Sequence, residues 1–213
     1  MGIRPGAEAA ARASLWALGF GVFTLVAQGL ASTSGGWHFV RTEFQAGAWW
    51  QLVTAQWVHF GTLHAGVNVA GLAVLLVAFQ NRVHGRLQGV ALVGGHLGVA
   101  LVLVWDTHCA FYAGASGALH GLLAGNLLSV WLGGQSAQGG NNTATRALAV
   151  AVLLGLGVKL LLQHPRGDSA ALGWLGFATY YPAHEAGTAG GLLAVVLVRW
   201  LVPLWFGPAF RPQ

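Results

Sequence analysis

Residues 114–125 read Gly-Ala-Ser-Gly-Ala-Leu-His-Gly-Leu-Leu-Ala-Gly, with a glycine at every fourth position from Gly117 through Gly121 to Gly125. Residues four apart lie on one face of an α-helix, so these glycines would form a stripe of small residues. Such a stripe lets the backbones of two membrane helices approach closely, because no side chain stands between them. We therefore predict a closely packed membrane helix that begins in this stretch.

The amino-acid composition indicates that this helix lies in lipid. Of the 213 residues, 55% are hydrophobic and only 7% are charged, which is too few charged groups to cover a water-soluble surface. The formal net charge of +5 comes from basic residues that are scattered singly, so a nucleic-acid partner is not expected. The single cysteine, Cys109, excludes an internal disulfide. We expect a polytopic membrane protein surrounded by membrane lipid.

Several apolar stretches approach the ~20 residues that a helix needs to cross a hydrocarbon core. Polar, glycine-rich or charged residues separate them. We predict an all-α bundle of six transmembrane helices, at Ser14–Leu30, Leu63–Phe79, Leu87–Trp105, Ser116–Leu132, Ala147–Leu162 and Pro182–Val202. Residues 14–202 would form one membrane domain between an N-terminal tail at 1–13 and a C-terminal tail at 203–213.

The positive charges predict the orientation of this bundle, because basic residues are enriched in cytoplasmic loops. One side of the predicted arrangement carries Arg4, Arg12, Arg82, Arg86, Arg146 and Arg211. The other side carries Arg41 and Arg166, with Lys159 near the outer end of the fifth span. Both termini are therefore expected in the cytoplasm, and the aromatic-rich segment 31–62 at the outer membrane surface. The apolar run Leu15–Leu30, which follows two arginines, could instead belong to a signal peptide.

Ser116 is the first candidate for chemistry. It stands in Gly114-Ala115-Ser116-Gly117, where an extramembrane turn becomes the start of the fourth span. A serine at a helix N-terminus presents its hydroxyl group, and the free backbone N–H groups there can stabilise a developing oxyanion. The alternative is that Ser116 only caps its helix within a glycine-rich turn.

His184 is the second candidate, because it opens the sixth span on the same outer face as Ser116. A neutral imidazole there can take the serine proton, and ionisable groups in lipid are costly unless they have a role. Gly187 and Gly191 follow it four residues apart, so this span could pack against the glycine stripe of the fourth span. An interfacial histidine and ordinary helix packing are the alternatives.

A third group of polar residues lies at the start of the second span. His64 and Asn68 are four residues apart and share one helical face, and His59 precedes them. The side chains of His64 and Asn68 can both donate hydrogen bonds, so they could complete an oxyanion hole. The alternative is that they hold helices together through polar contacts.

Together these residues resemble the rhomboid intramembrane proteases, and more narrowly their rhombosortase branch. The resemblance covers about residues 45–200 and rests on His64 with Asn68, on the motif around Ser116, and on His184 with the glycines after it. It implies a Ser116–His184 dyad without a carboxylate, and acyl transfer to Ser116. The oxyanion hole would combine the Ser116 backbone N–H with the His64 and Asn68 side chains.

Many rhomboids have a tyrosine four residues after the nucleophile, whereas this chain has His120 at that position. The run from Ser116 to Gly121 resembles the rhombosortase form. His120 could stack on or hydrogen-bond to His184, and filling space in the core is the alternative. The branch implies substrates that end in a Gly-Gly motif, a transmembrane helix and basic residues, cleaved on the periplasmic side of a bacterial inner membrane. A mobile cap over the site could come from Trp174, Phe177, Tyr180 and Tyr181.

The sequence also bears on other classes of function. Nine histidines invite a metal or haem site, but no HExxH motif or carboxylate cluster accompanies them, so no metal or other cofactor is expected. A transporter would be expected to show a broken-helix inverted repeat, and none is visible. A rhomboid-like protein that binds transmembrane helices without cleaving them is the main alternative, although both dyad positions are filled here.

Overall fold

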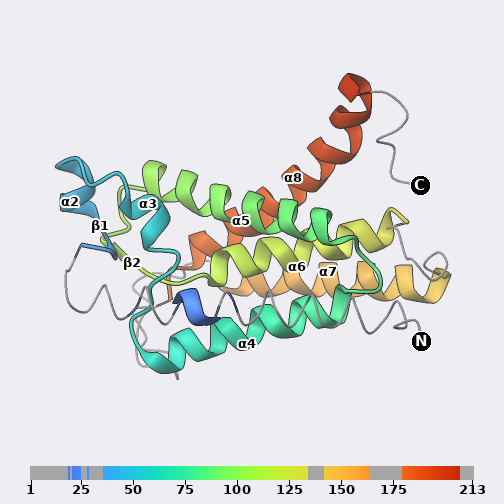
Figure 1. Ribbon diagram of the computed structural model, residues 1–213, viewed down its shortest axis with the longest axis horizontal. Helices are drawn as coiled ribbons and strands as arrows, with labels where there is room; N and C mark the ends of the chain where they lie inside the picture. The colour runs from blue at the N-terminus through green and yellow to red at the C-terminus, as the bar shows by residue number, and fades with distance from the viewer. Residues whose placement is uncertain are drawn as a thin grey trace, which may run out of the picture.

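The computed structural model describes residues 19, 21–24, 28, 36–133, 142–163 and 179–206. The described chain is mainly helical, with a short two-stranded sheet at one end of a helix bundle (Figure 1). In chain order the elements are β1 (Phe39–Val40), α2 (Arg41–Gln45), α3 (Gln51–Thr54), α4 (Thr62–Phe79), α5 (Gly85–Trp105), β2 (Phe111–Tyr112), α6 (Ser116–Trp131), α7 (Thr143–Gln163) and α8 (Tyr181–Phe206). The predicted tail at 1–13 and most of the first predicted span lie outside the described residues.

The long helices lie close to their predicted positions. The ends of α4, α5 and α6 fall within two residues of the expected ones. α7 begins at Thr143, earlier than the predicted Ala147, and its first turn has a side-chain cap. The side chain of Asn142 accepts a hydrogen bond from the backbone N–H of Thr145 at 2.8 Å, which satisfies a donor that the helix itself leaves unpaired.

The last helix is longer than the sixth predicted span, and the C-terminal tail predicted at 203–213 stays a prediction. α8 continues past the expected end at Val202 and through Pro203 to Phe206. A proline removes a backbone donor, but membrane helices tolerate it where neighbouring groups satisfy the freed carbonyl. The apolar character of the chain also continues through this stretch, so the composition does not change at Val202.

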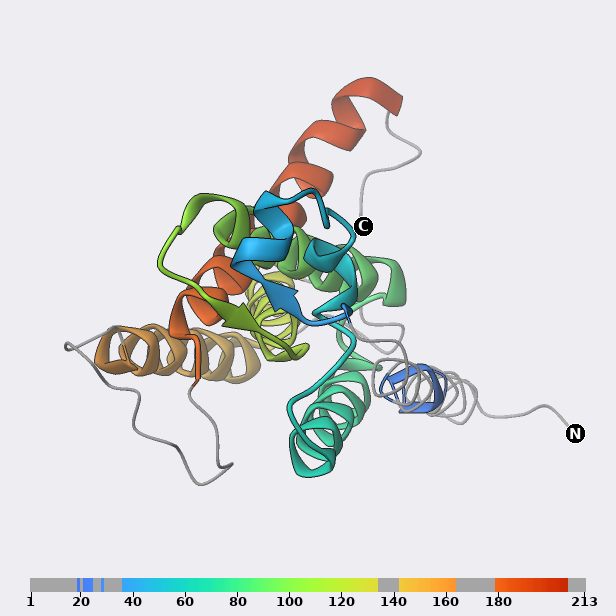
Figure 2. The same ribbon diagram turned by 90° about the vertical axis from the view of Figure 1, so that its left-hand side faces the viewer.

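α6 is the central helix of the bundle, and α4, α5, α7 and α8 all pack against it (Figure 2). Most of its residues are buried, including the polar side chains of Asn126 and Ser129. Among the described residues, α4, α5 and α7 are long and apolar enough to cross a membrane. Large apolar side chains such as Leu101 and Leu161 stay exposed on these helices, as lipid-facing side chains do. The arrangement of six spans stays a prediction.

A small outer layer covers the end of the bundle where α5 ends and α6 begins. β1 pairs antiparallel with β2, and Phe39 lies opposite Tyr112. Phe39 is fully buried in a cluster that includes Val99 and Leu103 of α5. This layer therefore joins the segment before α4 to the segment before α6, and so supports the turn that leads into Ser116.

Candidate active site

Ser116 is the first residue of α6, and the turn before it is held by hydrogen bonds. Gly114 has a φ of 119°, a conformation that favours glycine. Its N–H donates to the carbonyl of Ala55 at 2.9 Å, and its carbonyl accepts from the hydroxyl of Tyr112 at 2.7 Å. Ala115 is the N-cap residue and makes no side-chain cap. The first N–H groups of α6 therefore receive no hydrogen bond from an N-cap side chain.

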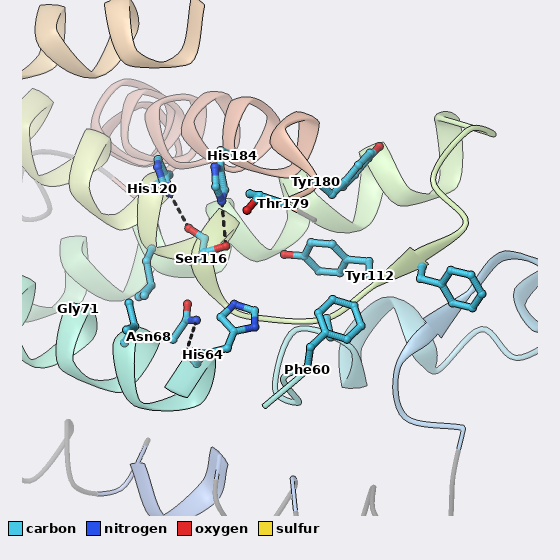
Figure 3. A pocket seen from close by; sticks show the side chains of 14 residues that line it. Phe60, His64, Asn68, Gly71, Tyr112, Ser116, His120, Thr179, Tyr180 and His184 are labelled. Carbon is cyan, nitrogen blue, oxygen red and sulfur yellow. Dashed lines mark hydrogen bonds between the residues drawn. The ribbon is translucent and has the colours of Figure 1, made fainter. Parts of the chain in front are cut away.

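The side chain of Ser116 meets His184, which lies in the first turn of α8. Ser116 Oγ is 2.9 Å from His184 Nε2, within hydrogen-bonding distance (Figure 3). The serine hydroxyl therefore contacts an imidazole rather than capping its own helix, which was the alternative considered for it. His184 is buried, and its Nδ1 has no hydrogen-bond partner within the described part of the chain.

Glycines allow α8 to approach α6 closely enough for this contact. A Cβ atom added to Gly187 would overlap the carbonyl oxygen of Gly117, and one added to Gly191 would overlap that of Gly121. The stripe continues at Gly125, where a Cβ would come within 3.2 Å of the Gly191 carbonyl. Both predicted stripes thus face each other with backbone against backbone.

A third glycine stripe, on α5, was missed in the sequence analysis. A Cβ at Gly95 would lie 2.7 Å from the carbonyl oxygen of Ala118, and one at Gly98 would overlap that of Ala186. Gly94 meets Gly190 of α8 in the same way. The four-residue spacing of Gly94 and Gly98 was the signal in the sequence. α5, α6 and α8 therefore form one tightly packed unit that holds Ser116 and His184.

His64 and Asn68 come from α4 and lie on the other side of Ser116 from His184 (Figure 3). A Cβ at Gly114 would lie 2.6 Å from His64 Cε1, so the imidazole lies directly against the turn before the serine. The Asn68 amide donates one hydrogen bond, at 2.9 Å, to the His64 carbonyl. Its second hydrogen is available to a ligand, because an amide nitrogen carries two.

His59 is buried behind His64 and does not line the cavity. The two rings meet edge to face, with centroids 4.8 Å apart. Burial, together with smaller effects of the nearby His64 and His38, lowers the pKa of His59 to about 3. His59 is therefore neutral at physiological pH, and its position suits packing against His64 rather than contact with a substrate.

His120 lies one turn after Ser116 and contacts both members of the pair. Its Nδ1 is 2.7 Å from the Ser116 carbonyl oxygen. Its ring stacks on that of His184, with centroids 4.1 Å apart and planes 11° from parallel. Of the two contacts considered for His120, the structure has the stack on His184 and no direct hydrogen bond to it.

A cavity of about 260 Å³ opens in front of the serine. Ser116, His184, His64 and Asn68 all line it, together with apolar side chains from α4 and α6. Tyr112 and Thr179 line it too, and no pattern in the sequence had singled them out. The volume is somewhat below the roughly 300–1,000 Å³ of typical ligand sites, so a few side chains fit but a whole helix does not.

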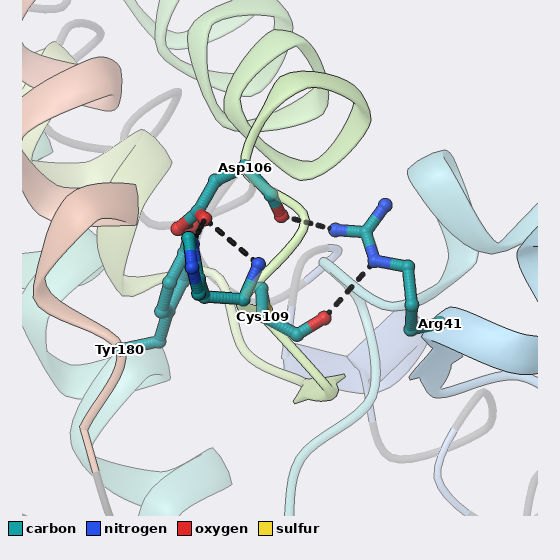
Figure 4. Close-up of polar contacts among 5 residues, drawn as sticks. Arg41, Asp106, Cys109 and Tyr180 are labelled. Atoms are coloured by element: carbon teal, nitrogen blue, oxygen red, sulfur yellow. Dashed lines mark hydrogen bonds and ion pairs between the residues drawn. The ribbon is translucent and has the colours of Figure 1, made fainter.

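Tyr180, which also borders the cavity, is anchored rather than loose. Its hydroxyl donates to Asp106 Oδ2 at 2.6 Å, and Arg41 donates to the Cys109 carbonyl at 3.2 Å beside it (Figure 4). Burial alone would raise the pKa of Asp106, but hydrogen bonds from Tyr180 and His108 outweigh it and hold the pKa below its usual value. Of the proposed cap residues, Trp174 and Phe177 lie outside the described residues.

Neither a reactive thiol nor a metal cluster lies near the pair in the described part of the chain. Burial is the largest effect on Cys109 and raises its pKa to about 12, so the thiolate is rare at neutral pH. No group of three His, Cys, Asp or Glu side chains within residues 36–133, 142–163 and 179–200 could hold a metal ion. The chemistry that this arrangement can perform is nucleophilic attack by a serine hydroxyl with an imidazole as base.

The fold is a helical membrane bundle, and a serine and a histidine are in contact at one end of it. Comparison with known families agrees with this description. The rhomboid domain family matches residues 46–201. The chain belongs to the rhomboid family of intramembrane serine proteases, which act on transmembrane substrates, and it is an integral membrane protein. Searches of curated proteins and of solved structures found no match.

Proposed function

We propose that this chain is an active rhomboid protease in which Ser116 is the nucleophile and His184 its general base. The observation that carries the proposal is the 2.9 Å contact between Ser116 Oγ and His184 Nε2 beside a cavity. A nucleophile within hydrogen-bonding distance of a base is the common arrangement of serine hydrolases.

In the first step, His184 Nε2 takes the Ser116 proton as Oγ bonds to the scissile carbonyl carbon. The carbonyl oxygen becomes an oxyanion, which the N-terminal N–H of α6 and the side chains of His64 and Asn68 would stabilise. The intermediate collapses when the C–N bond breaks and His184 returns the proton to the leaving amine. Water then attacks the acyl-enzyme while His184 takes its proton; the bond between the acyl carbon and Ser116 Oγ breaks, His184 returns the proton to Oγ, and the carboxylic acid product is released.

The proposed substrates are those that the rhombosortase branch implies: proteins with a C-terminal tail of Gly-Gly, a transmembrane helix and basic residues. A scissile bond must leave its helical hydrogen bonding before Ser116 can reach it, and glycine weakens a helix by roughly 1 kcal/mol relative to alanine. The small cavity, with Gly71 on its wall, suits residues without large side chains. In a bacterial inner membrane with both termini in the cytoplasm, the site would open to the periplasm.

The test is co-expression of the chain with a tagged substrate that carries such a tail, followed by mass spectrometry of the product. Wild type is expected to remove the tail near the glycines, whereas Ser116→Ala and His184→Ala are expected to leave it intact while remaining folded in the membrane. A fluorophosphonate probe should label wild type and not Ser116→Ala. If the probe labels neither protein and no rhomboid substrate is cut, the chain is a non-catalytic protein that binds transmembrane helices.

A further inference from the structure

Lys159 is the only lysine in the chain, and it lies within the apolar helix α7. An ionisable group in a membrane span is costly, so such a residue is expected to have a partner and a role. A lysine can extend its apolar stem along the helix to bring the ammonium group to a polar partner. The family match and the dyad give Lys159 no role.

The partner of Lys159 is His120, one turn after the nucleophile. Lys159 Nζ is 2.7 Å from His120 Nε2. The other ring nitrogen of His120 is 2.7 Å from the Ser116 carbonyl, and the ring stacks on His184. A continuous set of contacts therefore runs from Lys159 on α7 through His120 on α6 to both members of the proposed dyad. Figure 3 shows His120 beside Ser116 and His184.

These contacts determine where the His120 proton lies. The Ser116 carbonyl only accepts hydrogen bonds, so His120 Nδ1 must carry a proton and donate it. In neutral imidazole Nε2 is then unprotonated and accepts, which matches an ammonium donor at 2.7 Å. Without that donor, Nε2 would lose its partner, and the ring could take the other tautomer or turn over.

We propose that Lys159 is a positioning residue: its ammonium group holds His120 in the Nδ1-protonated tautomer, flat against His184 and bonded to the Ser116 carbonyl. A ring fixed in this way limits rotation of the His184 imidazole and keeps its Nε2 aimed at Ser116 Oγ. The proposal rests on the proposed protease function for its effect on rate, but the tautomer of His120 can be measured without any activity.

The first test measures cleavage of the tailed substrate by the full chain in lipid vesicles. Lys159→Met is expected to lower kcat about tenfold with little change in KM, below the ~10²-fold cost of a fully misplaced group. Lys159→Arg keeps a charged donor and should recover most of the rate. Val158→Met adds the same side chain at an exposed neighbouring position and should behave as wild type. An unchanged kcat in Lys159→Met, or an equal loss in Val158→Met, overturns the proposal.

The second test reads the tautomer by nitrogen NMR of histidine-labelled protein in lipid, with His120 assigned by loss of its signals in His120→Gln. Wild type should show a protonated Nδ1 and a hydrogen-bonded, unprotonated Nε2, and Lys159→Met should shift this pattern. A His120 pattern that is the same in both proteins overturns the proposal. If wild type neither reacts with fluorophosphonate nor cleaves the substrate, the proposed function fails. The second test alone then decides whether Lys159 sets the tautomer of His120.

Discussion

Gly114 determines how near His64 comes to Ser116. Its positive φ directs the chain sharply into α6, and the absence of a side chain leaves room for the His64 ring. Any other residue would both strain the backbone and displace the imidazole. The approach of His64 to the proposed oxyanion position therefore depends on a residue with no proposed role in the chemistry itself.

His64 and Asn68 are tested by separate alanine substitutions. Each is expected to lower kcat by about tenfold or more, because one oxyanion donor is typically worth ~10²–10³ in rate and two donors can partly replace each other. Cleavage kinetics in lipid vesicles measure this loss.

Asn126→Ala provides the matched control for Asn68→Ala. Asn126 is also a buried asparagine, but it lies farther along α6, beside Gln88. Its loss should lower stability without changing kcat per folded molecule. Full rates in both His64→Ala and Asn68→Ala would show that the oxyanion is stabilised elsewhere.

At the scale of the helices, α6 and α8 approach until their backbones are in contact. Gly187 faces Gly117 so closely that even a methyl group would overlap a carbonyl oxygen. In lipid there is no hydrophobic driving force between helices, so close packing is a main source of their association. The same contact sets the distance between Ser116 and His184, since both lie within one turn of these glycines.

Gly187→Ala is therefore expected to be strongly destabilising. Overpacking typically costs about 1–3 kcal/mol, and here the atom in the way is backbone, which cannot turn aside. The variant should show a lower Tm in detergent and little reaction of Ser116 with a fluorophosphonate.

The control for this substitution is Gly157→Ala on α7, where an added Cβ meets nothing within 4 Å. Alanine favours helix over glycine by about 1 kcal/mol, so Tm should stay the same or rise. Equal losses of Tm in the two variants would mean that general effects on the helices, and not the contact of α6 with α8, explain the result.

At the scale of the whole molecule, segments far apart in the chain meet at the end that carries the site. Arg41 from the segment before α4, Asp106 from the end of α5 and Tyr180 from the segment before α8 form one hydrogen-bonded group. Since Tyr180 is followed by α8, this group holds the start of the helix that carries His184. The proposed site is thus supported on its outer side by polar contacts and on its inner side by glycine packing.

The predicted orientation has both termini in the cytoplasm, and it is tested with single cysteines in a Cys109→Ala background. His108 is largely exposed beside the site, and Asn81 is exposed in the turn between α4 and α5 at the other end. A membrane-impermeant maleimide should label His108→Cys in cells with only the outer membrane opened. It should label Asn81→Cys only after the inner membrane is opened, and the reverse pattern would contradict the orientation.

The sequence alone determined the helical membrane class, the positions of α4, α5 and α6 to within two residues, and the rhomboid family. These properties follow from local patterns, namely apolar runs of sufficient length and glycines or polar residues repeated at helical spacing. Such patterns also nominated Ser116 and His184, although their catalytic role stays a prediction.

Only the tertiary structure decided which atoms meet. Ser116 and His184 are 68 residues apart in the chain, yet Ser116 Oγ meets His184 Nε2. In the same way, Lys159 on α7 contacts His120 on α6. A helical repeat gives the face on which a residue lies, but not how that helix is rotated, tilted or shifted against its neighbours. Those three quantities come from packing, here from glycines on α5, α6 and α8 that bring backbones into contact. The site therefore depends on interactions that no local pattern contains.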